Sequence, residues 1–165
     1  MSGLDPQRKI FTRHEALAFR RAADGPVVFT NGVFDLLHSG HVDVLRAARS
    51  EGDLLVVGLN SDASVRRLKG PARPVRTEAE RAYVLAALEC VDGVVVFDDD
   101  TPLSLVELLE PDVIVKGGDY SEASIVGARE VRQRGGRVVV VPLTPGQSTT
   151  SIIEKLRAQR NSSTA

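Results

Sequence analysis

Short apolar runs rich in β-branched residues recur along the chain and predict the strands of a sheet. They lie at residues 26–31, 53–60, 93–97, 112–117 and 137–143. Each run is apolar almost throughout, rather than at every second position, which is typical of central strands covered on both faces. The pattern therefore predicts five parallel strands.

The segments between these runs carry helix signals. Thr77 and Glu80 have the spacing of a capping box, and Gly52 follows an amphipathic stretch as a C-terminal cap. Helices are expected at residues 13–23, 41–52, 77–89, 101–110, 121–136 and 148–159. Strands that alternate with helices predict an α/β, Rossmann-like single domain, with a five-stranded parallel sheet and helices on both faces.

Length and composition fit one domain. With 165 residues, 42% of them hydrophobic, the chain can bury one core. We expect this domain at residues 13–158, between a flexible N-terminus at 1–12 and a flexible C-terminus at 159–165. The absence of a run typical of a signal peptide or a membrane span predicts a cytoplasmic protein without a membrane partner. The 21 basic and 22 acidic residues nearly cancel, so the composition gives no general reason to bind nucleic acid.

The candidate functional residues follow the predicted strands. They lie in segments 31–41, 60–76, 116–120 and 144–151. In open α/β sheets a ligand binds beyond the carboxyl ends of the strands, where the strand order reverses. These four segments are therefore expected to build one site. Cys90, the single cysteine, lies in an apolar run and is expected to be a small buried residue rather than a nucleophile.

His38 and His41 form the most distinctive pair in these segments. A zinc site would need at least a third ligand, and the only other histidine, His14, lies in the first predicted helix. A phosphate site needs no third side-chain ligand, because a helix begins near Gly40 and its first backbone N–H groups are free to bind an anion. Two histidines on a surface turn remain a third interpretation. The position of the pair, after a predicted strand and at the start of a predicted helix, favours the phosphate site over the other two interpretations.

The stretch "GVFDLLHSGHVDVL" resembles the H-x-G-H signature of a nucleotidyltransferase superfamily that includes cytidylyltransferases and pantetheine-phosphate adenylyltransferase. Three further segments, "RLKGPARPVRTEAERAYVLAALECVD", "DDDTPLSLVELLEPDVIVKGGDY" and "GQSTTSII", resemble the adenylyltransferases that make ADP-heptose. Those enzymes are free-standing or form the C-terminal half of a kinase fusion. The resemblance extends from about residue 27 to about residue 157.

One departure separates the branches of this superfamily. Glycerol-phosphate cytidylyltransferases carry R-T-E-G-I-S-T-T before the last helix, whereas Leu143 and Thr144 take the place of that arginine and threonine here. The resemblance thus implies transfer of AMP from ATP to a sugar 1-phosphate, D-glycero-D-manno-heptose 1-phosphate, with release of pyrophosphate. A glycerol-3-phosphate-type cytidylyltransferase that uses CTP stays open as an alternative. A nucleotide-binding regulatory module without turnover is the alternative from another class.

The resemblance also implies roles for individual residues. His38, His41 and Lys69 are the expected catalytic groups, which stabilise phosphate charge. Nucleotide binding is expected of Thr30, Asn31, Gly32, Phe34, Gly40, Gly117, Asp119, Ser148, Thr149 and Thr150. Substrate binding is expected of Asp35, Arg73, Arg76, Arg81 and Tyr120.

Several of these residues have a second interpretation. Lys69 and Arg81 could each be an ordinary surface charge, and Asp35 could be structural. Mg²⁺ is expected to arrive with ATP, bound by phosphates and water rather than by protein ligands. Similarity to the family also implies a homodimer.

Overall fold

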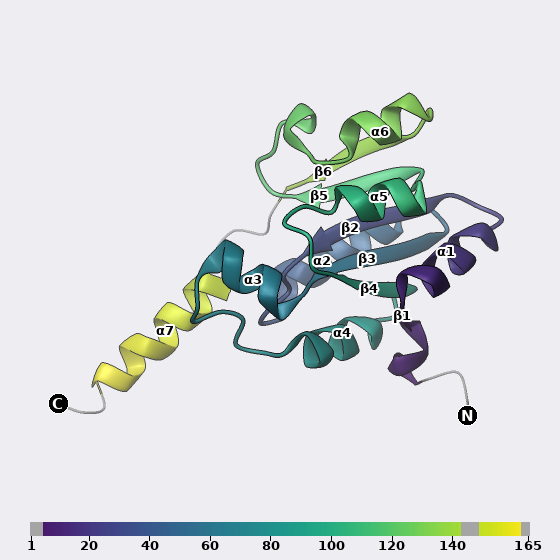
Figure 1. The fold of residues 1–165 in the computed structure, drawn as a ribbon. Coiled ribbons are helices and arrows are strands. Elements are labelled where there is room, and N and C mark those ends of the chain that lie inside the picture. The colour runs from purple at the N-terminus through teal and green to yellow at the C-terminus, as the bar shows by residue number, and fades with distance from the viewer. Residues whose placement is uncertain (1–4, 143–148, 163–165) are drawn as a thin grey trace.

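The structure is a computed structural model that describes residues 5–142 and 149–162. A six-stranded parallel sheet forms its centre, in the order β1-β4-β3-β2-β5-β6 (Figure 1). The strands are β1 (Ile10–Phe11), β2 (Val27–Gly32), β3 (Leu54–Asn60), β4 (Gly93–Phe97), β5 (Val113–Gly117) and β6 (Arg137–Val141). The helices are η1 (Pro6–Lys9), α1 (Arg13–Arg21), α2 (Ser39–Arg49), α3 (Asp62–Lys69), α4 (Glu78–Ala86), α5 (Leu103–Leu109), η2 (Glu122–Ser124), α6 (Ala128–Gln133) and α7 (Thr149–Ser162).

The five predicted strands are confirmed as β2 to β6, and the predicted strand count is wrong by one. The additional strand, β1, has two residues, Ile10 and Phe11, which pair with β4 at Val94 and Val95. Two residues are too few to produce a recognisable apolar run. The expected flexible segment 1–12 therefore contains a helical turn and an edge strand within residues 6–11. Residues 1–4 and 163–165, at the two expected flexible ends, lie outside the described residues.

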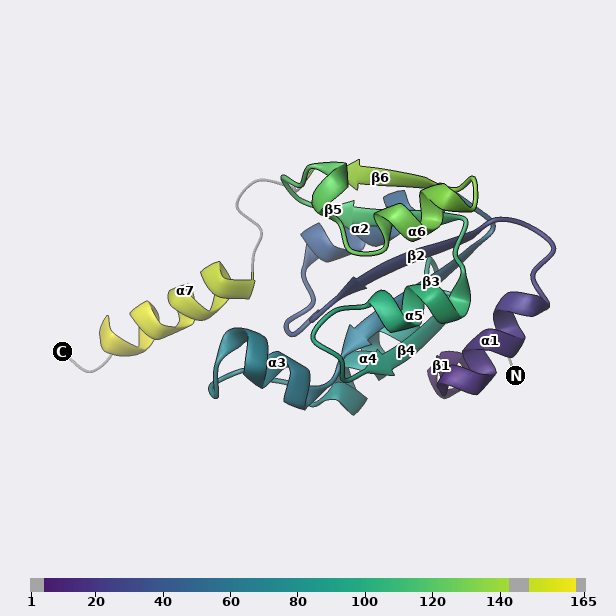
Figure 2. The ribbon, with the colours of Figure 1, turned by 45° about the horizontal axis from the view of Figure 1, so that its top comes forward.

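Helices cover both faces of the sheet, as expected (Figure 2). Alternate strand residues point to opposite faces. On one face Val27, Phe29 and Ile114 belong to a buried cluster with residues of α1, α5 and α6. On the other face Val28 and Val115 belong to a cluster with residues of α2 and α4. The core is thus two apolar layers, one on each side of the sheet.

The segment after β3 contains a helix that the sequence pattern does not predict. In α3, Ser61 is the N-cap, and its hydroxyl accepts a hydrogen bond from the backbone N–H of Ser64 at 3.0 Å. Gly70 ends the helix with φ at +93°, a conformation that glycine adopts without steric cost. The loop that follows connects α3 to α4.

The strand order reverses between β2 and β5. From β2 the chain proceeds to β3 and β4 on one side, whereas β5 and β6 lie on the other side. The pairing of β2 with β5 is limited to Val28 with Val113 and Phe29 with Ile114. Beyond these pairs the two strands separate toward their carboxyl ends. This is the position at which open α/β sheets form a ligand crevice.

Two further observations concern helices. In both ribbon views α7 extends away from the sheet (Figures 1 and 2). Among the residues that the structure describes, no helix has the length and apolarity needed to cross a membrane.

Candidate active site

A pocket of about 290 Å³ opens where β2 and β5 separate, and we call it the switch-point pocket. Its walls come from the end of β2 and the loop after it, the first turns of α2, the end of β5 and the first residue of α7. Its lining residues are Thr30, Asn31, Gly32, Val33, Phe34, His38, Gly40, His41, Val44, Lys116, Gly117, Tyr120 and Thr149. Segments that follow three different strands therefore meet at one site, whereas the fourth predicted segment, 60–76, contributes no residue to its described lining.

His38 and His41 lie face to face at the start of α2. Their ring centroids are 3.8 Å apart, with the rings stacked. The backbone N–H of His38, the N-cap residue, donates to Nδ1 of His41 at 3.3 Å. Since that nitrogen accepts a hydrogen bond, the neutral ring of His41 carries its proton on Nε2 and can donate it to a ligand. The local fold thus selects the tautomer of this histidine.

Burial favours the neutral form of both histidines. It lowers the pKa of His41 to about 4, with a smaller contribution from the neighbouring His38. Burial also lowers the pKa of His38. Nδ1 of His38 is buried and has no hydrogen-bond partner among the described residues. A buried polar atom without a partner is uncommon, and here it belongs to a residue that lines the pocket.

The loop between β2 and α2 is shaped by a close fit between Gly32 and Phe34. Phe34 has φ at +45°, in the left-handed region that few non-glycine residues adopt. A Cβ on Gly32 would lie 3.0 Å from the Phe34 ring, so glycine makes room for that ring. The ring also faces His41, with 5.2 Å between centroids. Strained backbone of this kind concentrates at functional sites.

Lys116 is a pocket residue that the sequence reasoning missed. It lies in the segment "VKGGDY", in which the sequence predicts roles for Gly117, Asp119 and Tyr120. Its ammonium donates to the backbone oxygen of Asn31 at 3.2 Å and to Oδ1 of the same residue at 3.0 Å. A lysine one residue before the end of an otherwise apolar strand was the available signal.

Most of the predicted nucleotide-binding residues line the switch-point pocket. These are Thr30, Asn31, Gly32, Phe34, Gly40, Gly117 and Thr149, and they are joined by Tyr120, which was expected to bind the sugar phosphate. Asp119 and Thr150 are exposed and are not among the lining residues. Lys69, the last residue of α3, is likewise exposed and outside the lining. Ser148, Leu143 and Thr144 lie outside the described residues.

Asp35 binds the loop that follows α3. Its buried carboxylate accepts hydrogen bonds from Nε of Arg73 at 2.5 Å and from the backbone N–H groups of Val75 and Arg76 at 2.8 and 3.0 Å. These contacts connect the loop after β2 to the loop after α3. The structure therefore shows Asp35 and Arg73 engaged with each other.

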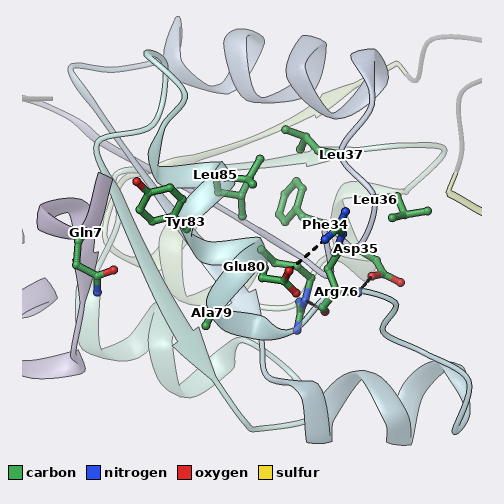
Figure 3. Close-up of a pocket in the computed structure, with 12 residues that line it drawn as sticks. Gln7, Phe34, Asp35, Leu36, Leu37, Arg76, Ala79, Glu80, Tyr83 and Leu85 are labelled. Carbon is green, nitrogen blue, oxygen red and sulfur yellow. Dashed lines mark hydrogen bonds and ion pairs between the residues drawn. The ribbon is translucent and has the colours of Figure 1, made fainter. Parts of the chain in front are cut away.

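A second hollow, of about 700 Å³, lies beside Asp35 between the loop after β2 and helix α4 (Figure 3). Its wall includes Phe34, which also lines the switch-point pocket. Leu36, Leu37 and Tyr83 surround it, so its surface is mainly apolar. The hollow contains no histidine, and the two histidines lie on the other side of Phe34, in the switch-point pocket.

Arg81 is buried, with all its described contacts inside the protein. Its guanidinium donates to the backbone oxygens of Arg76, Val33 and Asn60 at 3.0, 2.7 and 2.9 Å. It also pairs with the carboxylate of Asp62 at 2.8 Å. Arg81 thus joins the ends of β2 and β3 to helices α3 and α4, and it supports the site without lining the switch-point pocket.

Two stacked histidines and a helix N-terminus, set at the switch point of a parallel sheet, give this α/β domain a site of the kind that suits a phosphate group. The chain belongs to the cytidylyltransferase-like family, whose model matches residues 29–162. The predicted resemblance to nucleotidyltransferases is thereby confirmed.

Individual relatives agree with this assignment. The bifunctional protein HldE of Syntrophotalea carbinolica is 58% identical over 142 residues, which are 86% of this chain and 29% of that protein. The bifunctional protein HldE of Geotalea uraniireducens is 65% identical over 131 residues, 79% of this chain and 27% of that protein. The chain therefore spans less than a third of the length of these relatives.

Two solved structures share the fold. A lipopolysaccharide core biosynthesis protein from Thermoplasma volcanium superposes with a TM-score of 0.59 at 29% identity, covering 73% of this chain and 97% of that one. Pantoate-beta-alanine ligase from Francisella tularensis, in complex with an ATP compound and beta-alanine, has a TM-score of 0.57 at 12% identity. It covers 85% of this chain and 68% of the ligase, and it supports the fold alone.

Proposed function

We propose that this chain transfers AMP from ATP to D-glycero-D-manno-heptose 1-phosphate, giving ADP-heptose and pyrophosphate. The observation that carries the proposal is the convergence of His38, His41 and the start of α2 on one pocket at the switch point. The choice of a heptose phosphate rests on the motifs after each strand and on the high identity to the bifunctional HldE proteins. The motifs resemble adenylyltransferases that occur free-standing or fused to a kinase, and the bifunctional HldE proteins agree with the fused form.

The proposed reaction needs no general base. An oxygen of the sugar 1-phosphate is already an anion at neutral pH, and it attacks the α-phosphorus of ATP in line with the departing pyrophosphate. The new bond joins this oxygen to the α-phosphorus, and the bond from the α-phosphorus to the bridging oxygen of pyrophosphate breaks. Catalysis then consists of positioning the two reactants and stabilising charge.

The two histidines suit the pyrophosphate side of this reaction. His41 presents a neutral Nε2–H, because Nδ1 already accepts the hydrogen bond from His38. As negative charge develops on the leaving group, this donor and the first N–H groups of α2 stabilise it without being reorganised. Thr149, which lines the same pocket, offers a hydroxyl to the triphosphate.

The remaining predicted residues have places in this proposal. Thr30 and Gly117 would hold the nucleoside, with Asp119 at the rim of the pocket, and Tyr120 would contact the sugar phosphate. Lys69, exposed at the end of α3, would reach the phosphates of bound ATP from outside the pocket. Arg76 would approach the sugar phosphate from the neighbouring hollow.

Mg²⁺ would accompany ATP and neutralise part of its phosphate charge. Phosphates and water would supply most of its ligands. Within residues 5–142 and 149–162, no group of three His, Cys, Asp or Glu side chains is placed to hold a metal ion. The proposal includes a homodimer, on family similarity, and a cytoplasmic location, where ATP is made and used.

Incubation with ATP, Mg²⁺ and the heptose 1-phosphate tests the proposal, with pyrophosphate release as the measurement. We expect turnover with ATP and the heptose phosphate, and little turnover when CTP or glycerol 3-phosphate replaces either substrate. A clear preference for CTP would move the chain to the cytidylyl branch. Binding of ATP without pyrophosphate from any phosphate acceptor would indicate a regulatory module.

A further inference from the structure

Lys116 bridges the two strands that separate at the switch point. Pairing of β2 with β5 ends at Phe29 and Ile114, two residues before Asn31 and Lys116. Where the next backbone contacts would form, the ammonium of Lys116 donates instead to both oxygens of Asn31. A side chain thus spans the mouth of the crevice while leaving it open to a ligand.

The charge on this lysine has no carboxylate partner among the described residues. Among the described residues no ion pair includes Lys116, and its Nζ lies 6.0 Å from the ring centroid of Tyr120. Burial lowers the pKa of Lys116, since the ammonium has given up much of its water. A partly buried cation without a counter-charge gains more from a bound anion than an exposed lysine does.

A pocket that binds phosphate groups also needs a positive charge in its wall. Lys116 is the one lysine or arginine among the described lining residues, and burial favours the neutral form of both histidines. An ammonium has three donors, of which Asn31 accepts two. One donor remains for a ligand in the pocket that Lys116 lines.

We propose that Lys116 binds the phosphate of the acceptor substrate and holds it against the α-phosphate of the nucleotide. This inference rests on the proposed function, because it requires two phosphate anions in one pocket. The β and γ phosphates of ATP have Mg²⁺, the start of α2 and the histidine donors. The acceptor phosphate brings no metal, and its approach to the α-phosphate brings two anions together. A fixed cation where β2 and β5 separate reduces this repulsion.

Lys116→Met, with Lys116→Arg as the charge-retaining variant, tests the inference. Methionine preserves the approximate length of the side chain and removes its charge. Loss of one hydrogen bond to a charged group corresponds to about a tenfold to hundredfold change in affinity. We expect Lys116→Met to raise KM for the acceptor phosphate by this factor and to change KM for ATP less than about threefold. Lys116→Arg should restore much of the affinity for the acceptor.

Lys9→Met is the matched control. Nζ of Lys9 also donates to two backbone oxygens, those of Leu88 and Val91, at 3.3 and 2.8 Å, but it lies outside the pocket. This variant should lower the melting temperature and leave both KM values unchanged. Thermal unfolding of Lys116→Met separates any loss of fold from loss of binding.

The outcomes distinguish this inference from the proposed function. Equal rises of both KM values in Lys116→Met would show that Lys116 acts only by shaping the Asn31 side of the pocket, and an unchanged acceptor KM would exclude any contact. If the wild-type chain uses another phosphate acceptor, or CTP, the assignment of heptose 1-phosphate or of ATP as its substrate fails. The two KM values are then compared with the substrates that the chain does use. If it uses no phosphate acceptor at all, both proposals fall.

Discussion

At the scale of single residues, the site depends on how the backbone presents two histidines. The H-x-G-H spacing in the sequence predicts a phosphate site after the first long strand, and the structure places both rings there. The sequence does not reveal that His38 N–H donates to Nδ1 of His41, nor that burial lowers the pKa of His41 to about 4. The hydrogen bond depends on the N-cap position of His38 and the pKa on burial of the His41 ring, and together they favour His41 as a neutral donor.

His41→Ala removes this donor from the proposed transition state. We expect kcat to fall by about a hundredfold to a thousandfold, the usual effect of removing one oxyanion donor, while Kd for ATP changes little. Steady-state kinetics together with equilibrium titration of ATP measure the two quantities. His14→Ala, which removes an exposed histidine on α1, is the control and should behave as wild type. Near-normal turnover of His41→Ala would show that the ring is not catalytic.

At the scale of elements, the site depends on loops that are joined to one another by hydrogen bonds and ion pairs outside the pocket. Apolar runs and cap signals are local, so they predict β2 to β6 and most of the helices. The contacts of Asp35 with Arg73, and of Arg81 with the ends of β2 and β3, join segments about 20 to 50 residues apart. No local pattern encodes such contacts. For this reason the sequence leaves open whether Arg81 binds a substrate or supports the fold.

Arg81→Met separates these two roles. It would leave the partly exposed carboxylate of Asp62 and three backbone oxygens without their donor. We expect a loss of about 3 to 5 kcal/mol in the free energy of unfolding, measured by denaturant titration. Arg76→Met is the matched control, because Arg76 is exposed and pairs with Glu80 four residues later, a contact worth at most about 0.5 kcal/mol. A stable Arg81→Met with a raised KM for the sugar phosphate would instead support substrate binding.

At the scale of the whole molecule, the sheet reaches beyond the segment that defines the family. The family model begins at residue 29, whereas η1, β1 and α1 precede that residue and add an edge strand beside β4. Phe11 packs on Phe19 with 5.0 Å between ring centroids, and a Cβ on Gly93 would lie only 2.7 Å from the Phe11 ring. The sequence could not indicate this strand, because the identity of two residues says little without their partners in β4.

Removal of residues 1–11 tests whether this edge strand stabilises the domain or only decorates it. The deletion takes away the packing of Phe11 and the Lys9 contacts to Leu88 and Val91, and it leaves Thr12 to cap α1. Phe11 is partly buried, and full burial of a large apolar side chain contributes about 1.5 to 3 kcal/mol, so we expect the melting temperature to fall by on the order of 5 °C at most. Phe11→Ala should show part of the same decrease.

ATP affinity should persist in both variants, because the switch-point pocket lies at β2 and β5, whereas β1 pairs only with β4. A melting temperature equal to that of the full chain would show that the sixth strand contributes nothing to stability, and loss of ATP binding in a folded variant would show that it supports the site as well.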